Sequence, residues 1–591
     1  MRIAAVLQDR CQNKKCNKEC VNFCPLMRTG VECITFGEKG KPIISETLCQ
    51  GCGICINKCQ FGAIKIIGLA DELKDEMVHQ YGENSFRLYR LPVPKKGLIT
   101  GILGPNGIGK TTAIKILSGI EIPNLGNFNE PPDKEAVLKH FAGTELHDYL
   151  ENVYAGKTKI AMKPQYVDKL PENVKGVVRD LLGRVQERMT LEEAAKAFDL
   201  DEVLDRELSK LSGGELQRLA MAATMMKEAD VYFFDEPTSY LDIYQRVKMA
   251  RLIKELSKDK QVMVIEHDLA ILDYLADNVS VVYGSEGAYG VFTLARQVRT
   301  AINVYLDGYL PEENIKFRER PIEFESAPMG RTQWDTPDLI EFEHISKDFG
   351  EFKLDIDKGS VKIGESVGIV GPNATGKTTF VKMLAGVIEP DEGKLNTMVK
   401  VAYKPQYING DYDGTVQELL FAQAYDTVNS SFFEGEVLVP LSMKTLMEKD
   451  VKTLSGGELQ RLAITICLAT EADIYLFDEP SAYLDSNQRM NAAKTIRRMM
   501  EKTGRSGMIV DHDIYFIDMV SDSLMVFGGD PGHHGIGEGP FDMRIGMNKF
   551  LSAVDITFRR DADTHRPRIN KPDSRLDREQ KSKGEYYYAQ L

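Results

Sequence analysis

The chain has 591 residues, of which 43% are hydrophobic and 27% charged, and its net charge at pH 7 is −14. This length predicts roughly four domains of about 150 residues each, with enough apolar side chains for sizeable cores. The acidic balance argues against a general polyanion binder but leaves room for local basic patches. No run reaches the roughly 18 apolar residues of a membrane helix, and Gln8, Asp9 and Arg10 interrupt any secretion signal. We therefore expect a soluble protein located in the cytoplasm.

Nine of the ten cysteines lie within residues 11–59, and such clustering without a secretion signal favours metal binding over disulfides. The second half of this region, CQGCGICINKC (49–59), resembles the bacterial ferredoxin run that binds a [4Fe–4S] cluster. In that run the fourth cysteine serves the other cluster. The resemblance therefore implies one cluster on Cys24, Cys49, Cys52 and Cys55, and a second on Cys11, Cys16, Cys20 and Cys59.

Two departures from the ferredoxin pattern keep a second interpretation open. The first run is more widely spaced than the standard one, and Gln60 follows Cys59 where proline is usual. Two four-cysteine zinc sites are the alternative, because structural zinc also favours four thiolates. Cys33 and Cys467 are predicted to be buried thiols outside these sites.

Two later segments, LITGILGPNGIGKTT (98–112) and SVGIVGPNATGKTT (366–379), each read as a buried strand, a glycine-rich turn and a helix start. That context is the one in which a G-x-x-x-x-G-K-[ST] phosphate loop is expected. Loop amides would cradle phosphate oxygens, while Lys110 and Lys377 neutralise the terminal phosphates. The candidate nucleotide ligands are Gly104, Asn106, Gly107, Gly109, Lys110, Thr111 and Thr112, and Gly371, Asn373, Gly376, Lys377, Thr378 and Thr379.

Each phosphate loop has acidic partners downstream, in VYFFDEP (231–237) and IYLFDEP (474–480). Both segments read as buried strands that end in two acids. Asp235 and Asp478 would hold Mg²⁺ together with Thr111 and Thr378. Glu236 and Glu479 would orient or deprotonate the attacking water. Aromatic side chains upstream of the loops are candidates to stack on adenine: Tyr81, Phe86 and Tyr89, and Phe349 and Phe352.

The order of these motifs resembles that of a tandem ATP-binding-cassette protein. The decapeptide LSGGELQRLA occurs unchanged at 211–220 and 454–463 and contains that family's signature. KPQY (163–166 and 404–407) is similar to its glutamine loop, and EHD and DHD supply its switch histidines. The resemblance implies catalytic roles for Gln165, Gln406, His267 and His512, with both glutamines also near Mg²⁺.

The same resemblance implies that the two cassettes face head to tail and share two ATP molecules. The signature residues Ser212, Gly213 and Gly214 would then contact the ATP on Lys377. Ser455, Gly456 and Gly457 would contact the ATP on Lys110. Both sites have their glutamate, so both are expected to hydrolyse ATP.

The two halves differ in length. Lys110 and Gln165 are 55 residues apart, but Lys377 and Gln406 only 29, so the first cassette carries 26 more residues. Apolar residues at helical spacing within 131–156 predict a helix–loop–helix insertion, broken at Ala142-Gly143. It is either a contact arm for a partner or a decoration without function. The run 559–583 has nine Lys/Arg against five Asp/Glu, which is typical of a flexible segment or one that wraps another domain.

These features together predict an α/β protein with the following domains: a ferredoxin-like iron–sulfur domain (1–75), a first nucleotide-binding domain (76–292), a hinge (293–330), a second nucleotide-binding domain (331–537) and a C-terminal hinge or wrapping segment (538–591). The whole arrangement resembles the ABC-E family of ribosome-recycling ATPases, also called the RNase L inhibitor family. Two other interpretations are an iron–sulfur ATPase coupled to electron transfer and the ATPase subunit of a transporter.

The ABC-E resemblance implies a cytoplasmic ATPase with two [4Fe–4S] clusters, ATP and Mg²⁺. It implies that closure of the ATP sites moves the iron–sulfur domain and splits ribosomes after termination or rescue. The implied partners are the ribosome, above all its small subunit after splitting, a release or rescue factor, and initiation factors. rRNA contacts would come through the hinge and the insertion, and the protein would be a monomer whose cassettes pair with each other.

Overall fold

The computed structural model describes residues 2–37, 39–68, 71–318, 321–324, 335–395, 399–406 and 410–587. Contacts within the chain divide it into two compact units. The first comprises Met1–Ser239, Ile253–His267 and Ala276–Arg320, and the second comprises Tyr240–Leu252, Asp268–Leu275 and Pro321–Leu591. Among the described residues, no helix has both the length and the apolar character needed to cross a membrane.

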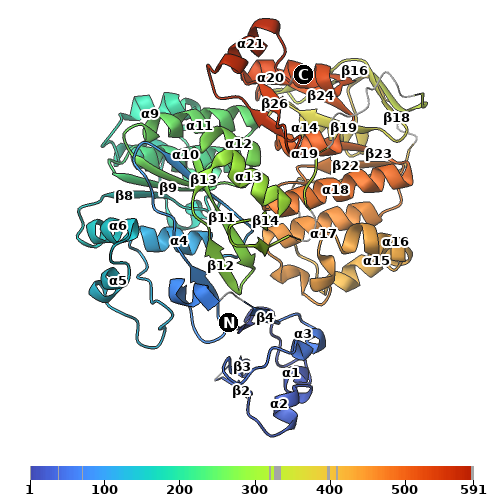
Figure 1. Ribbon diagram of the computed structural model, residues 1–591. Coiled ribbons are helices and arrows are strands. Elements are labelled where there is room, and N and C mark those ends of the chain that lie inside the picture. The colour runs from blue at the N-terminus through green and yellow to red at the C-terminus, as the bar shows by residue number, and fades with distance from the viewer. Residues whose placement is uncertain are drawn as a thin grey trace. The chain divides into compact units, whose positions relative to one another are not determined.

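The cysteine-rich N-terminal part of the first unit is built from short elements (Figure 1). Strand β1 (Arg2–Val6) pairs with β4 (Ile64–Gly68), and β2 (Ile34–Phe36) pairs with β3 (Pro42–Ile44), both antiparallel. Two short helices lie within the cysteine runs, α1 (Glu19–Asn22) and α3 (Ile54–Lys58), and α2 (Pro25–Arg28) follows the first run. So small a core buries little apolar surface, which makes folding depend on what the cysteines bind.

A mixed sheet forms the rest of the first unit, in the order β5-β6-β12-β11-β7-β10-β9-β8. Its centre is parallel, and β7 and β9 are buried along their whole length, as expected for strands covered on both faces. The strands are β5 (Met77–Gln80), β6 (Arg87–Tyr89), β7 (Ile99–Leu103), β8 (Ile160–Lys163), β9 (Val231–Asp235), β10 (Gln261–Ile265), β11 (Asn278–Ser285), β12 (Tyr289–Phe292) and β13 (Arg296–Gln297).

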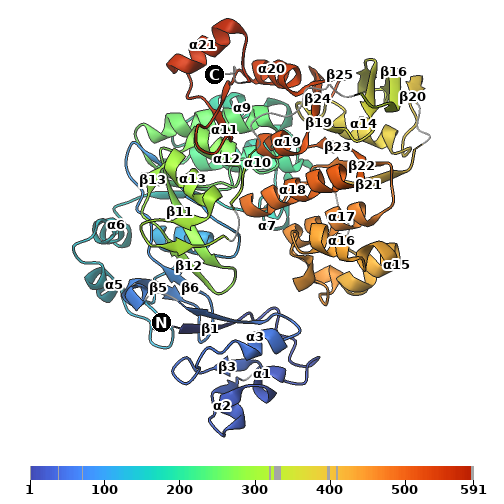
Figure 2. The ribbon, with the colours of Figure 1, turned by 45° about the vertical axis from the view of Figure 1, so that its right-hand side comes forward.

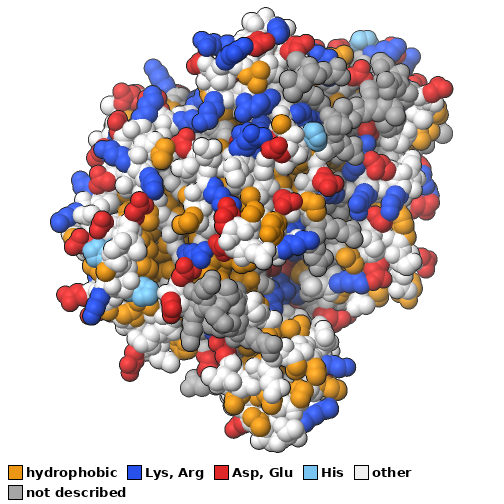
Figure 3. Space-filling view, viewed as in Figure 1, with side chains coloured by type: hydrophobic (Ala, Val, Ile, Leu, Met, Phe, Trp, Pro, Cys, Tyr) orange, Lys and Arg blue, Asp and Glu red, His pale blue; other side chains and the backbone are white. Residues whose placement is uncertain are grey.

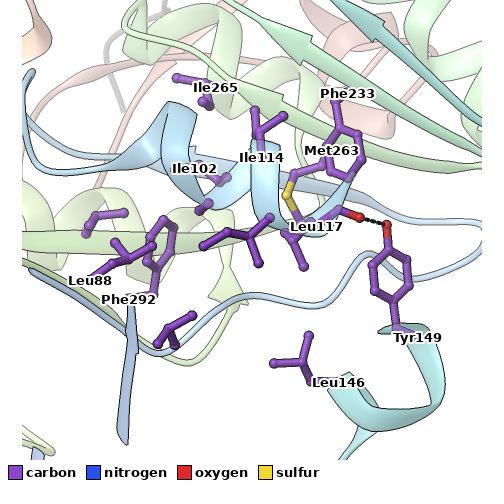
Figure 4. Packing of buried hydrophobic residues seen from close by; sticks show 14 of the residues in the cluster. Leu88, Ile102, Ile114, Leu117, Leu146, Tyr149, Phe233, Met263, Ile265 and Phe292 are labelled. Atoms are coloured by element: carbon purple, nitrogen blue, oxygen red, sulfur yellow. Dashed lines mark hydrogen bonds between the residues drawn. The ribbon is translucent and has the colours of Figure 1, made fainter. Parts of the chain in front are cut away.

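Helices pack against this sheet and form its core (Figure 4). Ile114 and Leu117 of α4 (Lys110–Leu117) lie against Phe233 of β9 and Met263 of β10. The other helices of the first unit are α7 (Leu170–Asn173), α8 (Val178–Gly183), α9 (Leu191–Phe198), α10 (Gly213–Met225) and α13 (Val298–Asp307). Helix α11 (Ile243–Ser257) is divided between the two units, and α12 (Leu269–Leu275) belongs to the second. After α13, β14 (Tyr309–Leu310) pairs with β15 (Ile315–Lys316).

The segment 131–156 contains two helices, α5 (Lys134–His140) and α6 (Glu145–Tyr154). Each has a side-chain cap at its start, from Asp133 and Thr144. Gly143 between them has φ +80°, a conformation that glycine adopts without strain. The hydroxyl of Tyr149 donates a hydrogen bond of 2.9 Å to the carbonyl of Leu117, so α6 is fastened to the end of α4.

The second unit repeats the same sheet, in the order β18-β16-β17-β25-β24-β19-β23-β22-β21. Strand β19 takes the place of β7, and β22 that of β9, again with parallel neighbours. The strands are β16 (Asp338–Asp348), β17 (Lys353–Ile356), β18 (Gly359–Lys362), β19 (Ser366–Val370), β20 (Glu392–Leu395), β21 (Val401–Lys404), β22 (Ile474–Asp478), β23 (Ser506–Val510), β24 (Ser523–Asp530) and β25 (His534–Asp542).

The helices of the second unit include a layer beside the sheet in which α15 and α16 lie next to α17 (Figure 2). Helix α15 is kinked at Ala424, where φ is −157° and ψ is 59°. The helices are α14 (Lys377–Leu384), α15 (Val416–Val428), α16 (Ser431–Phe433), α17 (Gly456–Ala469), α18 (Ser486–Thr503), α19 (Ile514–Val520), α20 (Met543–Val554) and α21 (Arg575–Lys583).

The basic C-terminal run is folded rather than flexible, which corrects one of the two interpretations of its composition. Strand β26 (Phe558–Arg560) pairs with β27 (Pro567–Ile569), and α21 follows. Arg566 is fully buried and donates to a carboxylate oxygen of Asp273 at 2.9 Å, and Arg568 donates to both oxygens of Asp273. These two arginines are therefore not free to meet RNA.

Two of the predicted domain boundaries can be compared with the helices and strands. Strand β25 crosses the predicted boundary at residue 537, and α13 lies inside the predicted hinge. Residues 319, 320 and 325–334 of that hinge, and Tyr407 of the second KPQY segment, lie outside the described residues.

Candidate functional site

The first phosphate loop joins β7 to α4. Gly109 caps α4 with φ +92°, and a Cβ there would meet Phe86 and Leu88 at 2.6 to 2.8 Å, so only glycine fits. Lys110 folds back over the loop, where its Nζ donates to the carbonyls of Gly104 at 2.8 Å and Pro105 at 2.7 Å. The loop is thus closed around a cation at the start of a helix, which is an arrangement suited to binding phosphate.

The second phosphate loop has the same construction between β19 and α14. Gly376 caps the helix with φ +90°, and Lys377 Nζ donates to the carbonyl of Gly371 at 3.0 Å and to that of Pro372. Burial lowers the pKa of Lys377 to about 8, against nearby carboxylates that raise it. A bound phosphate would stabilise the charged form of this lysine further.

The two metal-ligand candidates lie at the ends of β9 and β22, beside the loops. The hydroxyl of Thr111 donates to Asp235 Oδ2 at 3.1 Å. Burial raises the pKa of Asp235 to about 6 and that of Asp478 to about 6. Thr378 stands in the same relation to Asp478, since a hydrogen bond from its hydroxyl lowers the pKa of that carboxyl against the effect of burial. A buried carboxylate beside a hydroxyl and the phosphate loop supplies the oxygen ligands that Mg²⁺ prefers, so these residues suit Mg²⁺.

Each glutamate that the sequence predicts to be catalytic lies at the centre of its predicted set of side chains. Gln165 Nε2 donates to Glu236 Oε1 at 2.9 Å, and Gln406 Nε2 donates to Glu479 Oε1 at 2.8 Å. His267 Nε2 lies 3.7 Å from Glu236 Oε1.

The same histidine geometry recurs in the second half, where His512 Nε2 lies 3.5 Å from Glu479 Oε1. Burial alone would raise the pKa of Glu479, but His512, Gln406 and Lys377 outweigh it and lower that pKa to about 2. The Glu479 carboxylate therefore stays charged at neutral pH and can accept a hydrogen bond from water.

The signature segments begin the helices α10 and α17. Ser212 and Ser455 are the N-cap residues, and each forms a capping box with the glutamate three residues later, Glu215 or Glu458. The following glycines leave the first amides of the helix uncovered, which gives each helix an N-terminus able to face an anion. The pairing of each signature with the opposite ATP stays a prediction.

The eight cysteines predicted to bind the clusters line two separate cavities. One is lined by Cys24, Cys49, Cys52 and Cys55, and the other by Cys11, Cys16, Cys20 and Cys59. These are the two interleaved sets expected from the ferredoxin-like run. About 390 Å³ and 440 Å³ of space, partly open to solvent, lie between the side chains.

Four cysteines line each cavity, in the two interleaved sets, and four thiolates are the ligand set of a [4Fe–4S] cluster. Burial raises the pKa of Cys20 to about 11 and that of Cys55 to about 12, so cluster binding must displace protons from these thiols.

Two groups of residues near the sites were missed from sequence. Cys33 is buried, as predicted, but it also lines the first cavity beside Cys24 and Cys49; its spacing matches no cluster run. Lys163 and Lys404 lie beneath the catalytic glutamates. Their signal was available, because lysine precedes Pro-Gln in both halves.

The adenine candidates differ in exposure. Tyr89 is buried within the sheet, whereas Tyr81 is half exposed and its hydroxyl lies 3.1 Å from Thr112 Oγ1 at the start of α4. Tyr81 is therefore the best placed in the first cassette. In the second, Phe349 and Phe352 stack on each other with ring centroids 6.5 Å apart.

Comparison with known protein families matches three kinds of domain along the chain. Residues 94–239 and 354–482 match the ABC transporter family. Residues 1–32 match a possible Fer4-like domain in RNase L inhibitor, and residues 42–65 match the 4Fe–4S binding domain. The fold and the sites thus define an ATPase with two ATP-binding cassettes and an iron–sulfur domain with two [4Fe–4S] clusters.

Relatives of the full length are known. The chain is 50% identical to an uncharacterised ABC transporter ATP-binding protein of Methanocaldococcus jannaschii, over 100% of this chain and 98% of that protein. It is 46% identical to ABC transporter E family member 1 of Arabidopsis thaliana (99% and 98%). It is 43% identical to translation initiation factor RLI1 of Saccharomyces cerevisiae (99% and 98%).

Two solved structures are similar as well. A chain in a model of ribosome-bound archaeal Pelota and ABCE1 is 51% identical, with a TM-score of 0.93 and coverage of 100% of this chain and 99% of that one. A chain in a crystal structure of archaeal ribosomal stalk protein aP1 with the archaeal ribosome recycling factor aABCE1 is 52% identical, with a TM-score of 0.84. That match covers 88% of this chain and 100% of that one. The chain belongs to the ABC-E family of ATPases, the RNase L inhibitor family.

Proposed function

We propose that this ATPase splits ribosomes into subunits after termination or rescue, and that closure of its two ATP sites moves the iron–sulfur domain. The observation that carries the proposal is that a chain with two sets of predicted hydrolysis residues, each gathered around one glutamate, has its iron–sulfur domain fastened to the nucleotide-binding part of the same unit. Neither the transporter nor the electron-transfer interpretation accounts for this arrangement in a chain whose full-length relatives include a translation factor.

Asn84, in the turn between β5 and β6, makes that attachment. Its Nδ2 donates to the carbonyls of Ala4 at 3.2 Å and Ile44 at 3.0 Å, and its Oδ1 accepts from the amide of Ile44. Its own carbonyl accepts from the amide of Val6 at 2.9 Å. Tyr81, the best-placed adenine candidate, lies in the same turn, so movement of this turn on ATP binding would reach the iron–sulfur domain.

Within each site the residues divide the work of hydrolysis. The lysines and loop amides bind the phosphates, and Mg²⁺ held by Asp235 and Asp478 would neutralise charge that develops on them. Glu236 and Glu479 orient the attacking water and accept its proton, with the glutamines and histidines holding their carboxylates. ATP bound at both sites favours the closed state, and hydrolysis removes that bias.

The partners follow from the family. Pelota, a ribosome and a ribosomal stalk protein accompany the two similar structures, and we transfer ribosome and rescue-factor binding to this chain. Figure 3 shows hydrophobic side chains on the face of the iron–sulfur domain. Phe36 of this domain is 39% exposed, and Lys18 Nζ lies 4.7 Å from the centre of its ring, a pairing that suits contact with RNA bases. Further rRNA contacts through the hinge and insertion, monomeric state and location in the cytoplasm belong to the same proposal.

Sedimentation with ribosomes tests this function. The purified protein with intact clusters is mixed with ribosomal particles of the source organism, with and without nonhydrolysable ATP and a release factor. The proposal expects the protein to sediment with the small subunit when the analogue is present, and to remain unbound without nucleotide. Absence of affinity for ribosomal particles under every condition would refute it.

A further inference from the structure

Both cassettes bury a lysine at the end of the strand that leads into the glutamine loop. Lys163 ends β8 and Lys404 ends β21, and their side chains are 0% and 1% exposed. Burying an ammonium group costs much free energy unless its hydrogen bonds are satisfied. A lysine retained at the same buried place in two separate halves therefore calls for a reason other than packing.

Each lysine binds the backbone of the catalytic glutamate. Lys163 Nζ donates to the carbonyl of Asp235 at 2.9 Å and to that of Glu236 at 3.2 Å. Lys404 Nζ donates to the carbonyl of Asp478 at 2.7 Å and to that of Glu479 at 3.2 Å. The two oxygens that each ammonium group binds thus belong to consecutive residues, the metal-ligand candidate and the glutamate.

The glutamates need such support because their backbone is strained. Glu236 has φ +49° and Glu479 has φ +48°, a left-handed conformation that side chains other than glycine rarely adopt. Strain of this kind persists only where the surroundings hold it in place. The amides of the glutamates are held by the carbonyls of Ile265 and Val510, at 2.9 and 2.8 Å.

The signature decapeptide supplies a second donor to the same carbonyl. Gln217 Nε2 donates to the carbonyl of Glu236 at 2.8 Å, and Gln460 Nε2 donates to that of Glu479 at 2.7 Å. Both glutamines are fully buried. The glutamate carbonyl is therefore held from two sides, by the strand before the glutamine loop and by the signature helix.

We infer that Lys163 and Lys404 are positioning residues for ATP hydrolysis, which hold the peptide of the catalytic glutamate so that its carboxylate faces the attacking water. The inference deepens the proposed function, because it rests on the hydrolysis site, but it does not depend on the ribosome as partner. Lys163 lies two residues before Gln165, and Lys404 two residues before Gln406. Each lysine therefore links the start of its glutamine loop to the same glutamate that the glutamine of that loop binds.

Lysine-to-methionine variants of the full chain with its clusters test the inference, since methionine fills similar space without the charge. In K163M combined with K404M, kcat for ATP hydrolysis should fall roughly 10- to 100-fold through misplacement of the carboxylate. The KM for ATP should stay nearly unchanged, because the phosphate loops are untouched. Lys159→Met and Lys400→Met are the matched controls, since each replaces an exposed lysine four residues earlier on the same strand lead-in; they should retain wild-type kcat.

A second comparison separates positioning from a merely structural role. The lysine changes are repeated in a chain that already carries both E236Q and E479Q. There they should leave the residual hydrolysis and the affinity for ATP unchanged, because the lysines act through the two glutamates. Q217M with Q460M should reproduce the loss of kcat at constant KM. Unchanged kcat in the lysine variants, or an equal loss of ATP affinity in both backgrounds, would overturn the inference. Neither outcome bears on ribosome binding, so the proposed function would stand.

Discussion

Cys24 and Cys59 each end one cysteine run but line the cavity of the other run. Short helices make this exchange possible. Cys24 caps α2 and Cys59 caps the end of α3, so each lies at a point where the chain turns. Two clusters bound in this way would tie the N-terminal and C-terminal parts of the domain together twice.

Serine substitutions test the interleaving. C24S should lose the cluster shared with Cys52 and keep the other, so iron per chain should fall by about half, because each cluster takes four thiolates. C24S with C52S should lose no more iron than C24S alone, whereas C24S with C16S should lose nearly all. The measurement is iron content with the visible absorption of the clusters. If C24S with C16S lost only half, the ligand sets would be grouped by run instead.

The catalytic glutamates give a second prediction at this scale. E236Q and E479Q should each lower hydrolysis at their own site by about 10²- to 10⁴-fold, because the amide cannot accept a proton from water. Nucleotide affinity should be retained, and by analogy with the family the variants should stay closed on a ribosomal subunit. Single-turnover hydrolysis and nucleotide binding measure the two effects. Turnover near that of the wild type in the double variant would contradict the assignment.

Which residues sequence could identify depends on how local their signal is. Lys110, Thr111 and Gly109 form one continuous motif, so their site was predictable. No such local motif indicates that Cys33 lies beside the cluster cysteines or that Tyr81 is better placed than Tyr89. The role of Cys33 depends on folding beside distant cysteines, and Tyr81 is distinguished from Tyr89 only by burial in the sheet.

At the scale of elements, the insertion is part of the first cassette's core. Leu146 and Leu150 of α6 are buried, and Tyr149 is bonded to α4. The helical spacing of these residues predicted the helix and its buried face. The spacing could not predict what that face packs against, because α4 is a separate element earlier in the chain and its contact with α6 depends on the tertiary fold.

Truncation of one buried leucine tests this packing. L150A should destabilise the first cassette by about 2 to 5 kcal/mol, since it leaves a cavity beneath α4. The neighbouring Glu151 is exposed, and E151A should change stability by only about 0.5 kcal/mol. Denaturant unfolding followed by circular dichroism gives both values. Equal stability of L150A and the wild type would mean that α6 is not packed as described.

The C-terminal segment shows where composition misleads. Its charge and prolines are typical of a flexible chain, yet Arg566 and Arg568 are buried because Asp273, almost 300 residues away, binds both. Tyr515 also contacts Arg566, at 2.8 Å. Composition reports the charges of a segment but not the presence of a distant carboxylate that can pair with them.

Removal of that carboxylate should release the segment. D273A removes the carboxylate that binds both buried arginines, and loss of one member of a buried ion pair costs about 3 to 5 kcal/mol. The C-terminal segment should then become sensitive to limited proteolysis, with cleavage within residues 559–583. D259A, which removes an exposed carboxylate outside this contact, is the control. If D273A resisted the protease as well as the wild type does, the ion pairs of Asp273 with Arg566 and Arg568 would not be what holds the segment in place.

At the scale of the whole molecule, duplication accounts for the hydrolysis sites but not for their use. The two halves repeat the sheet order, the capped signature helices and the contacts around each glutamate. The repeated motifs made the two cassettes predictable from sequence. The iron–sulfur domain, the insertion and the C-terminal segment bound by Asp273 occur once, and they distinguish this chain from other ATPases of the same fold.

The central claim is that ATP drives this protein to separate ribosomal subunits. Light scattering of ribosomes at equilibrium measures this directly, because scattering falls as subunits part. With the protein, ATP and a rescue factor of the source organism, scattering should fall with time. It should stay constant without nucleotide and with a chain whose Lys110 and Lys377 are both replaced by alanine. Constant scattering with the wild-type protein and all components present would contradict the account.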